Sequence, residues 1–157
     1  MSEHETVVAI VAAAGSGRRM GADKIMRELH GKPLLAWAVD ILQQSTLIHR
    51  IILVLHKDNL AGCEKLASAR GWNKVSSICE GGELRQDSVR NGLWHAGGCQ
   101  WVLIQDGARP FLTDKLISDG LAAVSVFIDP AGNAPAETGL FRMGALNVYK
   151  RLLDEHF

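Results

Sequence analysis

A glycine-rich loop followed by basic residues is the first feature of this sequence that could do chemistry. The apolar run Val7–Val11 leads through alanines into Gly15–Gly17, and Arg18, Arg19 and Lys24 follow closely. Glycines let backbone N–H groups close on an anion, and the basic side chains add charge that a bare turn lacks. The pattern predicts a site for a nucleotide or another phosphate ester. The alternative is an ordinary strand-to-helix turn with solvated arginines.

Two common phosphate-binding motifs do not fit this loop. The dinucleotide-binding pattern G-x-G-x-x-G fails because Met20 stands where its third glycine should be. The Walker-type pattern fails because Lys24 follows Asp23 rather than a glycine. The Gly31-Lys32 pair does not restore that pattern, since Pro33 comes next.

A second candidate group surrounds Asp106, just after the apolar run Trp101–Ile104. A carboxylate there could hold Mg²⁺, which usually keeps several waters and bridges one or two carboxylates to substrate phosphates. It could instead cap the turn that follows. Arg109 lies three residues further on, where it could contact a phosphate of a second substrate or form an ion pair with Asp106. The residues alone leave both choices open.

The segment Gly81–Ser88 is a third candidate, because two glycines precede a predicted helix. Backbone groups at Gly82 could read the edge of a base, and the Ser88 hydroxyl could hydrogen-bond to it. An ordinary strand-to-helix connection explains the same spacing.

The totals exclude several classes of protein. A chain of 157 residues is expected to form one domain with a real core. Because Lys+Arg 17 balances Asp+Glu 17, no excess charge points to nucleic acid or a membrane surface as a partner. The three cysteines lie far apart, which fits a reducing cytosol better than a disulfide framework or a zinc site. A polar N-terminus and the lack of a membrane-length apolar run predict a cytoplasmic protein without a signal peptide.

Strand and helix signals alternate along the chain, which predicts an α/β protein with three layers and a mostly parallel, doubly wound sheet. Four apolar runs predict strands: Val7–Val11, Ile51–Leu55, Val75–Cys79 and Trp101–Ile104. Between and after them, helices are predicted for Pro33–Gln43, for Asp58–Arg70 with Asp58 as the cap and Gly71 at the end, for Leu84–Ala96, and for Asp114–Val124 with Thr113 as the cap. In such sheets ligands bind at the carboxyl ends of the strands, so the three candidate segments are expected to meet at one edge.

The pattern weakens from about Ser125. Val126–Ile128 is compatible with a short strand, and Asp129–Gly139 is rich in proline, glycine and alanine, as loops are. In Ala145–Phe157, apolar residues recur at helical spacing. We therefore expect a C-terminal helix there, with one apolar side formed by Leu146, Tyr149, Leu152 and Leu153.

Four ordered segments together resemble one family. They read AAAGSGRRMGADK, GKPLLAW, CEGGELRQDSVRNGL and VLIQDGARPF. They are similar to the cytidylyltransferases of 2-C-methyl-D-erythritol 4-phosphate, which act in non-mevalonate isoprenoid biosynthesis, and the resemblance spans about Val7–Val124. It implies a nucleotide-diphospho-sugar transferase-like (Rossmann-like) fold. Ribitol-phosphate cytidylyltransferases share much of the pattern and are the alternative.

The resemblance also implies a reaction and a role for each matching residue. A phosphate oxygen of the acceptor would attack the α-phosphate of CTP, pyrophosphate would leave, and Mg²⁺ would assist. Arg19 matches the transition-state arginine of the family and Lys24 matches its lysine partner, so the resemblance implies a catalytic role for both. By the same resemblance, the triphosphate would be bound by Ala13, Ala14, Gly15, Ser16 and Gly17. Cytosine would be held by Gly82 and Ser88. Asp106 matches the metal ligand of the family, and Arg109 lies where its acceptor site begins.

After about Val124 the resemblance ends. The family's dimerisation arm and its acceptor-binding segments find no match in Ser125–Phe157, and Gly107 replaces an alanine usual in the family. The homodimer of the family is therefore doubtful for this chain, and an apolar sheet edge is expected where the match stops. The hypothesis from sequence is CTP and Mg²⁺ binding with weak or missing transfer. A non-catalytic CTP-binding module is the alternative from another class.

Overall fold

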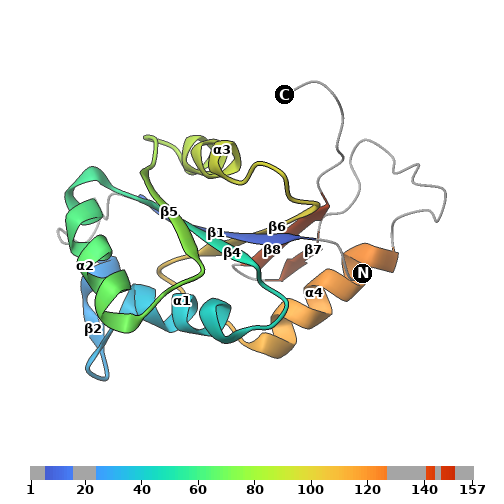
Figure 1. Ribbon diagram of the computed structural model, residues 1–157, viewed down its shortest axis with the longest axis horizontal. Helices are drawn as coiled ribbons and strands as arrows, with labels where there is room; N and C mark the ends of the chain where they lie inside the picture. The colour runs from blue at the N-terminus through green and yellow to red at the C-terminus, as the bar shows by residue number, and fades with distance from the viewer. Residues whose placement is uncertain (1–5, 16–23, 127–140, 144–145, 151–157) are drawn as a thin grey trace.

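The structure is a computed structural model that describes residues 6–15, 24–126, 141–143 and 146–150 (Figure 1). Within these residues one six-stranded sheet has the order β5-β4-β1-β6-β8-β7. Its strands are β1 (Val7–Ala13), β4 (Arg50–Leu55), β5 (Val75–Glu80), β6 (Trp101–Asp106), β7 (Phe141–Met143) and β8 (Leu146–Lys150). The helices are α1 (Leu34–Gln44), α2 (Leu60–Arg70), α3 (Arg85–His95) and α4 (Asp114–Val126), with short 3-10 turns η1 (Lys24–Met26) and η2 (Lys57–Asn59).

The parallel centre of the sheet confirms the four predicted strands. β1 pairs in parallel with β4 on one side and β6 on the other, and β5 pairs in parallel with β4. The side chains of Val7–Val11 are fully buried, as expected of a strand that is covered on both faces. Continuous apolar runs of this kind indicate interior strands of a parallel sheet.

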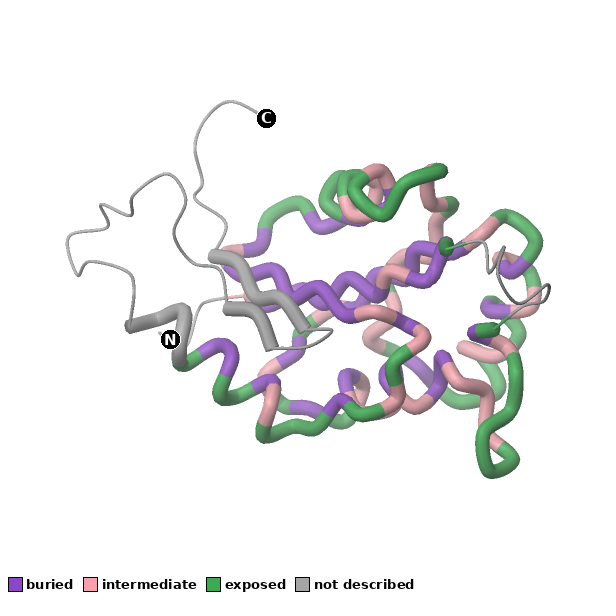
Figure 2. Tube along the Cα trace, turned by 180° about the vertical axis from the view of Figure 1, so that it is seen from behind, coloured by how far each residue is buried: buried purple, intermediate pink, exposed green. Residues whose placement is uncertain are grey.

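Helices cover both faces, so the predicted three-layer arrangement is confirmed. Figure 1 shows α1, α2 and α4 on one side of the sheet and α3 on the other. Side chains of β1 alternate between the two cores: Val7 and Val11 face the first layer, and Ile10 faces α3. In Figure 2 the buried strands run between helices whose outer faces are exposed. The α3 helix approaches closely at Gly92, where an added Cβ would lie 2.6 Å from Ile10 Cγ2.

The helix ends match the predicted signals with one exception. Gly71 follows α2 with φ 67°, a left-handed conformation that glycine adopts without strain. Thr113 Oγ1 accepts the Leu116 N–H at 3.1 Å and so caps α4. The prediction that Asp58 caps a helix is wrong. Asp58 lies inside η2, and the His56 side chain accepts its backbone N–H instead.

Asp40 of α1 ties three elements of the first helical layer together. Its carboxylate lies 2.6 Å from Lys32 Nζ and accepts Arg70 Nε–H at 3.1 Å and Trp72 Nε1–H at 2.7 Å. Burial alone would raise the pKa of Asp40, but the hydrogen bonds from Arg70, Lys32 and Trp72 outweigh it and lower the pKa to about 2. The carboxylate is therefore charged across the whole physiological range.

A hairpin that the sequence analysis did not predict precedes α1. β2 (Glu28–Leu29) pairs with β3 (Lys32–Pro33) in antiparallel fashion. Its two turn residues, His30 and Gly31, have φ of 52° and 73°. Positive φ at both central residues is what a tight two-residue hairpin turn requires.

The structure corrects the expectations for the C-terminal part. The predicted helix over Ala145–Phe157 is wrong in its described portion, because β8 runs antiparallel to β6 with Gln105 opposite Leu146. Pairing satisfies the N–H and C=O groups along β6, so tertiary context overrides the helical spacing. β6 is therefore an interior strand of the described sheet, and the strand at that edge is β7. Val126 ends α4 rather than starting a strand, and Phe127, Ile128 and Asp129–Gly139 lie outside the described residues.

Among the helices of the described residues, none combines the length and the apolar character that a bilayer crossing requires.

Candidate functional site

The strand order creates a switch point between β1 and β6. From β1 the chain moves outward in one direction to β4 and β5, then returns to place β6 on the other side of β1. The strands end level, since Ala12 is opposite both Val54 and Asp106. In open α/β sheets the crevice beyond the carboxyl ends at such a point is where ligands bind. The predicted convergence of the candidate segments is tested at this edge.

The connection after β6 packs directly against the end of β1. Gly107 N–H donates to Ala12 O at 3.0 Å. Gly107 is buried, and an added Cβ would lie 2.6 Å from Ala13 Cβ and 3.1 Å from Leu35 Cδ1. Close packing against β1 and α1 therefore explains why this chain has glycine at position 107. Gly15 follows β1 as an exposed residue.

The turn between β5 and α3 joins the same edge. Gly81 N–H donates to Leu55 O at 2.8 Å, which holds the start of the turn against the end of β4. An added Cβ at Gly81 would lie 2.2 Å from Ala14 Cβ and 2.6 Å from Ser88 Oγ. The absence of a side chain thus lets the turn contact the end of β1. The β5–α3 turn and the turn after β6 therefore meet the end of β1 at one edge, as predicted, while residues 16–23 of the glycine-rich loop lie outside the described residues.

Ser88 has a structural task in this turn. Its side chain is almost fully buried, and Oγ accepts the Gly82 N–H at 3.2 Å and donates to Leu84 O at 3.4 Å. These bonds fix the backbone at Gly82 before α3 begins. The predicted contact of Gly82 and Ser88 with a base stays a prediction. The Ser88 oxygen accepts one hydrogen bond in the turn and keeps a second lone pair for such a contact.

Asp106 ends β6 with its carboxylate between two arginines. Oδ1 accepts hydrogen bonds from Arg85 Nε at 3.2 Å and Arg85 Nη2 at 2.9 Å. Arg109 Nε lies 3.6 Å from Oδ2, so the ion-pair alternative for Arg109 is what the structure shows. The Asp106 side chain is 28% exposed, whereas Arg85 and Arg109 are 55% and 64% exposed. The carboxylate is thus accessible but balanced by positive charge.

Two residues of this group were missed by the sequence analysis. Arg85 is the first residue of α3 and lies 21 positions before Asp106, so no local pattern links them. Gln105 is buried, and its Nε2 donates to Asp106 O at 3.2 Å and to Arg109 O at 3.3 Å. The amide therefore closes the turn that carries Asp106 and Arg109. A polar residue at the end of a buried apolar strand was the signal available.

Of the remaining predicted site residues, the structure describes some and not others. Lys24 is exposed at the start of η1, where the next residue, Ile25, is buried in the main core. Ser16, Gly17 and Arg19 lie outside the described residues. Their predicted roles at a triphosphate stay predictions.

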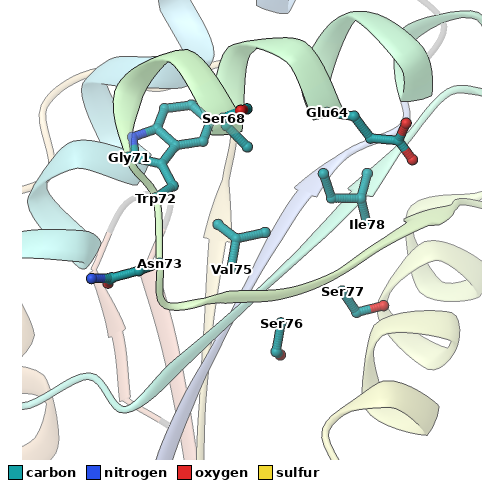
Figure 3. Close-up of a pocket in the computed structure, with 10 residues that line it drawn as sticks. Glu64, Ser68, Gly71, Trp72, Asn73, Val75, Ser76, Ser77 and Ile78 are labelled. Atoms are coloured by element: carbon teal, nitrogen blue, oxygen red, sulfur yellow. The ribbon is translucent and has the colours of Figure 1, made fainter.

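A separate hollow of about 630 Å³ lies between α2 and β5, away from this edge (Figure 3). Trp72, Val75 and Ile78 contribute its apolar lining, and Glu64 contributes a carboxylate. Its lining includes no lysine or arginine, so it is unsuited to a triphosphate. The charged edge beside β1 and β6 is the better candidate for the functional site.

The donor set at this edge fits a cation that arrives with its substrate. Among the residues that the structure describes, no cluster of three or more histidine, cysteine or acidic side chains could form a metal cage. Asp106 offers a single carboxylate, which is enough for Mg²⁺ when substrate phosphates and waters complete the shell. The carboxylate would have to exchange an arginine contact for the cation.

Comparison with known proteins agrees with the motifs. The family model described as 2-C-methyl-D-erythritol 4-phosphate cytidylyltransferase matches residues 7–135. A protein of that name from Dehalococcoides mccartyi is 48% identical over 124 residues, which are 78% of this chain and 55% of the relative. Another from Clostridium perfringens is 43% identical over 117 residues, or 73% and 52% of the two chains. The chain thus spans about half the length of the curated relatives it matches.

Solved structures show the same fold. A 4-diphosphocytidyl-2C-methyl-D-erythritol synthase from Anaerococcus prevotii has a TM-score of 0.71 at 21% identity, covering 93% of this chain and 71% of its own. A CMP:2-keto-3-deoxy-manno-octonic acid synthetase solved with CTP has a TM-score of 0.61 at 19% identity, covering 81% and 49%. The expected nucleotidyltransferase-like fold is confirmed. Because the family model covers most of the chain, this chain belongs to the 2-C-methyl-D-erythritol 4-phosphate cytidylyltransferase family.

Proposed function

We propose that this chain binds CTP at the carboxyl ends of β1, β5 and β6 and transfers CMP to 2-C-methyl-D-erythritol 4-phosphate, releasing pyrophosphate. The carrying observation is the meeting of three motif segments at the switch point: Ala14 against Gly81, Ala13 against Gly107, and Asp106 against Arg85. These segments bring backbone donors, a carboxylate and guanidinium groups to one edge of the sheet. A nucleoside triphosphate requires the same mixture of groups.

The nucleotide half of the proposal assigns the base to the β5–α3 turn. Gly82 and Ser88 would hold cytosine through backbone groups and the hydroxyl, and the segment Ala13–Gly17 would bind the triphosphate. Family membership supports the choice of CTP, as does the CTP-bound relative of the same fold.

The transfer step needs alignment and neutralisation of charge. The acceptor phosphate oxygen forms a bond to the α-phosphorus of CTP while the bond to the bridging oxygen of pyrophosphate breaks. Arg19 and Lys24 would stabilise the negative charge on the α-phosphate, and Arg109 would face the acceptor phosphate. A divalent cation held by Asp106 would supply further positive charge against the phosphates.

The test is pyrophosphate release from CTP and Mg²⁺ with 2-C-methyl-D-erythritol 4-phosphate, beside an Arg19→Ala control. Release that disappears in the control supports the proposal, because loss of a transition-state charge typically costs about 10²–10³-fold in rate. Ribitol phosphate serves as the competing acceptor. Release only with ribitol phosphate would reassign the acceptor. CTP binding without release from either acceptor would refute transfer and favour a CTP-binding module.

A further inference from the structure

Of the two arginines beside Asp106, Arg85 makes the shorter contact to the carboxylate that is proposed to hold the cation. Two of its guanidinium nitrogens share Asp106 Oδ1, at 2.9 and 3.2 Å, whereas Arg109 is 3.6 Å from the other oxygen. We propose that Arg85 is a positioning residue that holds Asp106 in the ligand-free protein and releases Oδ1 when a divalent cation binds. This inference rests on the proposed role of Asp106 as the cation ligand.

The exposure of the two partners makes such an exchange physically reasonable. Arg85 is 55% exposed, so its side chain can leave the carboxylate and remain hydrated. An ion pair this exposed contributes little, and a divalent cation with its phosphates can outweigh it. Asp106 is less exposed, at 28%, and is fixed at the end of a paired strand. The arginine is therefore the partner that moves.

Arg85 also links two parts of the proposed site. It is the first residue of α3, directly after the turn in which Gly82 donates to Ser88. Its release from Asp106 would leave the guanidinium anchored on that turn, within reach of the edge where the triphosphate is proposed to lie. Cation binding at β6 and base binding at α3 would then be coupled through one side chain.

A purely structural ion pair makes the opposite prediction. If Arg85 only tethers α3 to β6, its removal would leave Asp106 less well placed and cation binding unchanged or weaker. If Arg85 competes with the cation, its removal would make cation binding tighter. The sign of the change separates the two roles.

The experiment is titration with Mn²⁺ of the protein with saturating CTP and no acceptor, with protein-bound Mn²⁺ followed by electron paramagnetic resonance. Arg85→Gln is compared with Arg90→Gln, which removes the same charge from the same helix. The control is matched because Arg90 pairs with Asp87 and not with Asp106. We expect Arg85→Gln to bind Mn²⁺ about three- to fivefold more tightly than Arg90→Gln, the effect of one exposed ion pair. Equal or weaker binding would overturn the Arg85 proposal. Asp106→Asn reports separately on the cation site: binding unchanged by that substitution would refute the cation assignment itself.

A second measurement does not depend on affinity. In CTP-loaded protein with ¹⁵N-labelled arginine, Mg²⁺ should shift the Nε–H resonance that Arg85→Gln removes, and the shift should be absent in Asp106→Asn. Asp106-dependent Mg²⁺ binding that leaves this resonance in place would overturn the proposal. Neither readout uses turnover, so failure of CMP transfer would not be mistaken for failure of the Arg85 proposal.

Discussion

Gly81→Ala is the substitution that tests the packing of the site most directly. An added Cβ would lie 2.2 Å from Ala14 Cβ, about 1.3 Å short of the usual carbon–carbon contact of about 3.5 Å. Ala14 has no rotamer through which to retreat, and it is buried at the end of β1. The turn between β5 and α3 must therefore shift as a whole.

The expected change in the free energy of unfolding of Gly81→Ala follows from two opposing effects. An alanine reduces the conformational entropy of the unfolded chain and would stabilise by about 0.4–1 kcal/mol where it fits. Overpacking at a rigid contact costs about 1–3 kcal/mol, so the clash dominates. Gly81 does not have a left-handed φ, and backbone strain therefore does not add to the effect. Each kcal/mol corresponds to about 2–4 °C in Tm for a chain of this size.

The assay is urea unfolding followed by tryptophan fluorescence, together with calorimetric measurement of the CTP Kd. Gly97→Ala is the matched control, because nothing lies within 4 Å of the position of its added Cβ. We expect Gly81→Ala to unfold at lower urea and to bind CTP more weakly, with Gly97→Ala close to the parent in both. A Gly81→Ala protein as stable as Gly97→Ala would refute the packing argument.

Three further substitutions test other contacts. Asp40→Asn should lower the free energy of unfolding by about 2 kcal/mol at pH 7, measured by urea unfolding. The pKa of Asp40 is lowered from 3.8 to about 2, so the charged carboxylate stabilises the fold above about pH 4. The parent protein should lose this stabilisation as the pH falls towards 2, whereas Asp40→Asn should not. Thr113→Ala removes the acceptor of the Leu116 N–H and should lower the free energy of unfolding by about 1 kcal/mol. Thr113→Ser keeps a hydroxyl acceptor and should retain most of the stability of the parent. Ser88→Ala leaves the preceding turn without its buried acceptor, which should cost about 1 kcal/mol and weaken CTP binding; unchanged Tm and Kd would contradict that role.

The sequence identifies the parallel core because its signals are local. Val7–Val11 and Trp101–Ile104 are apolar without interruption, a pattern that is typical of short strands buried on both faces. The placement of Asp106 at the carboxyl edge follows from the same reasoning. Strand polarity and the right-handed crossover rule then bring the candidate loops together before any contact is known.

What the sequence could not predict depends on contacts between distant residues. The pairing of Arg85 with Asp106 follows from the side of the sheet that α3 covers, which periodicity does not specify. The C-terminal error has a similar origin. Leu146 and Tyr149 fit a helical spacing, but Val148 and Tyr149 also favour a strand, and the open ladder of β6 decides between them.

The segment with the weakest sequence signal lies beside the strand that carries the proposed cation ligand. β8 pairs with β6 up to Gln105, one residue before Asp106, while β1 pairs with β6 from the other side up to Asp106 itself. Without β8, β6 would be an edge strand with unpaired backbone groups, and its end would be free to fray. The Gln105 amide then fixes the turn beyond the strand. The position of Asp106 thus depends on backbone pairing with β1 and β8, and its charge is balanced by two arginine side chains that are more than half exposed.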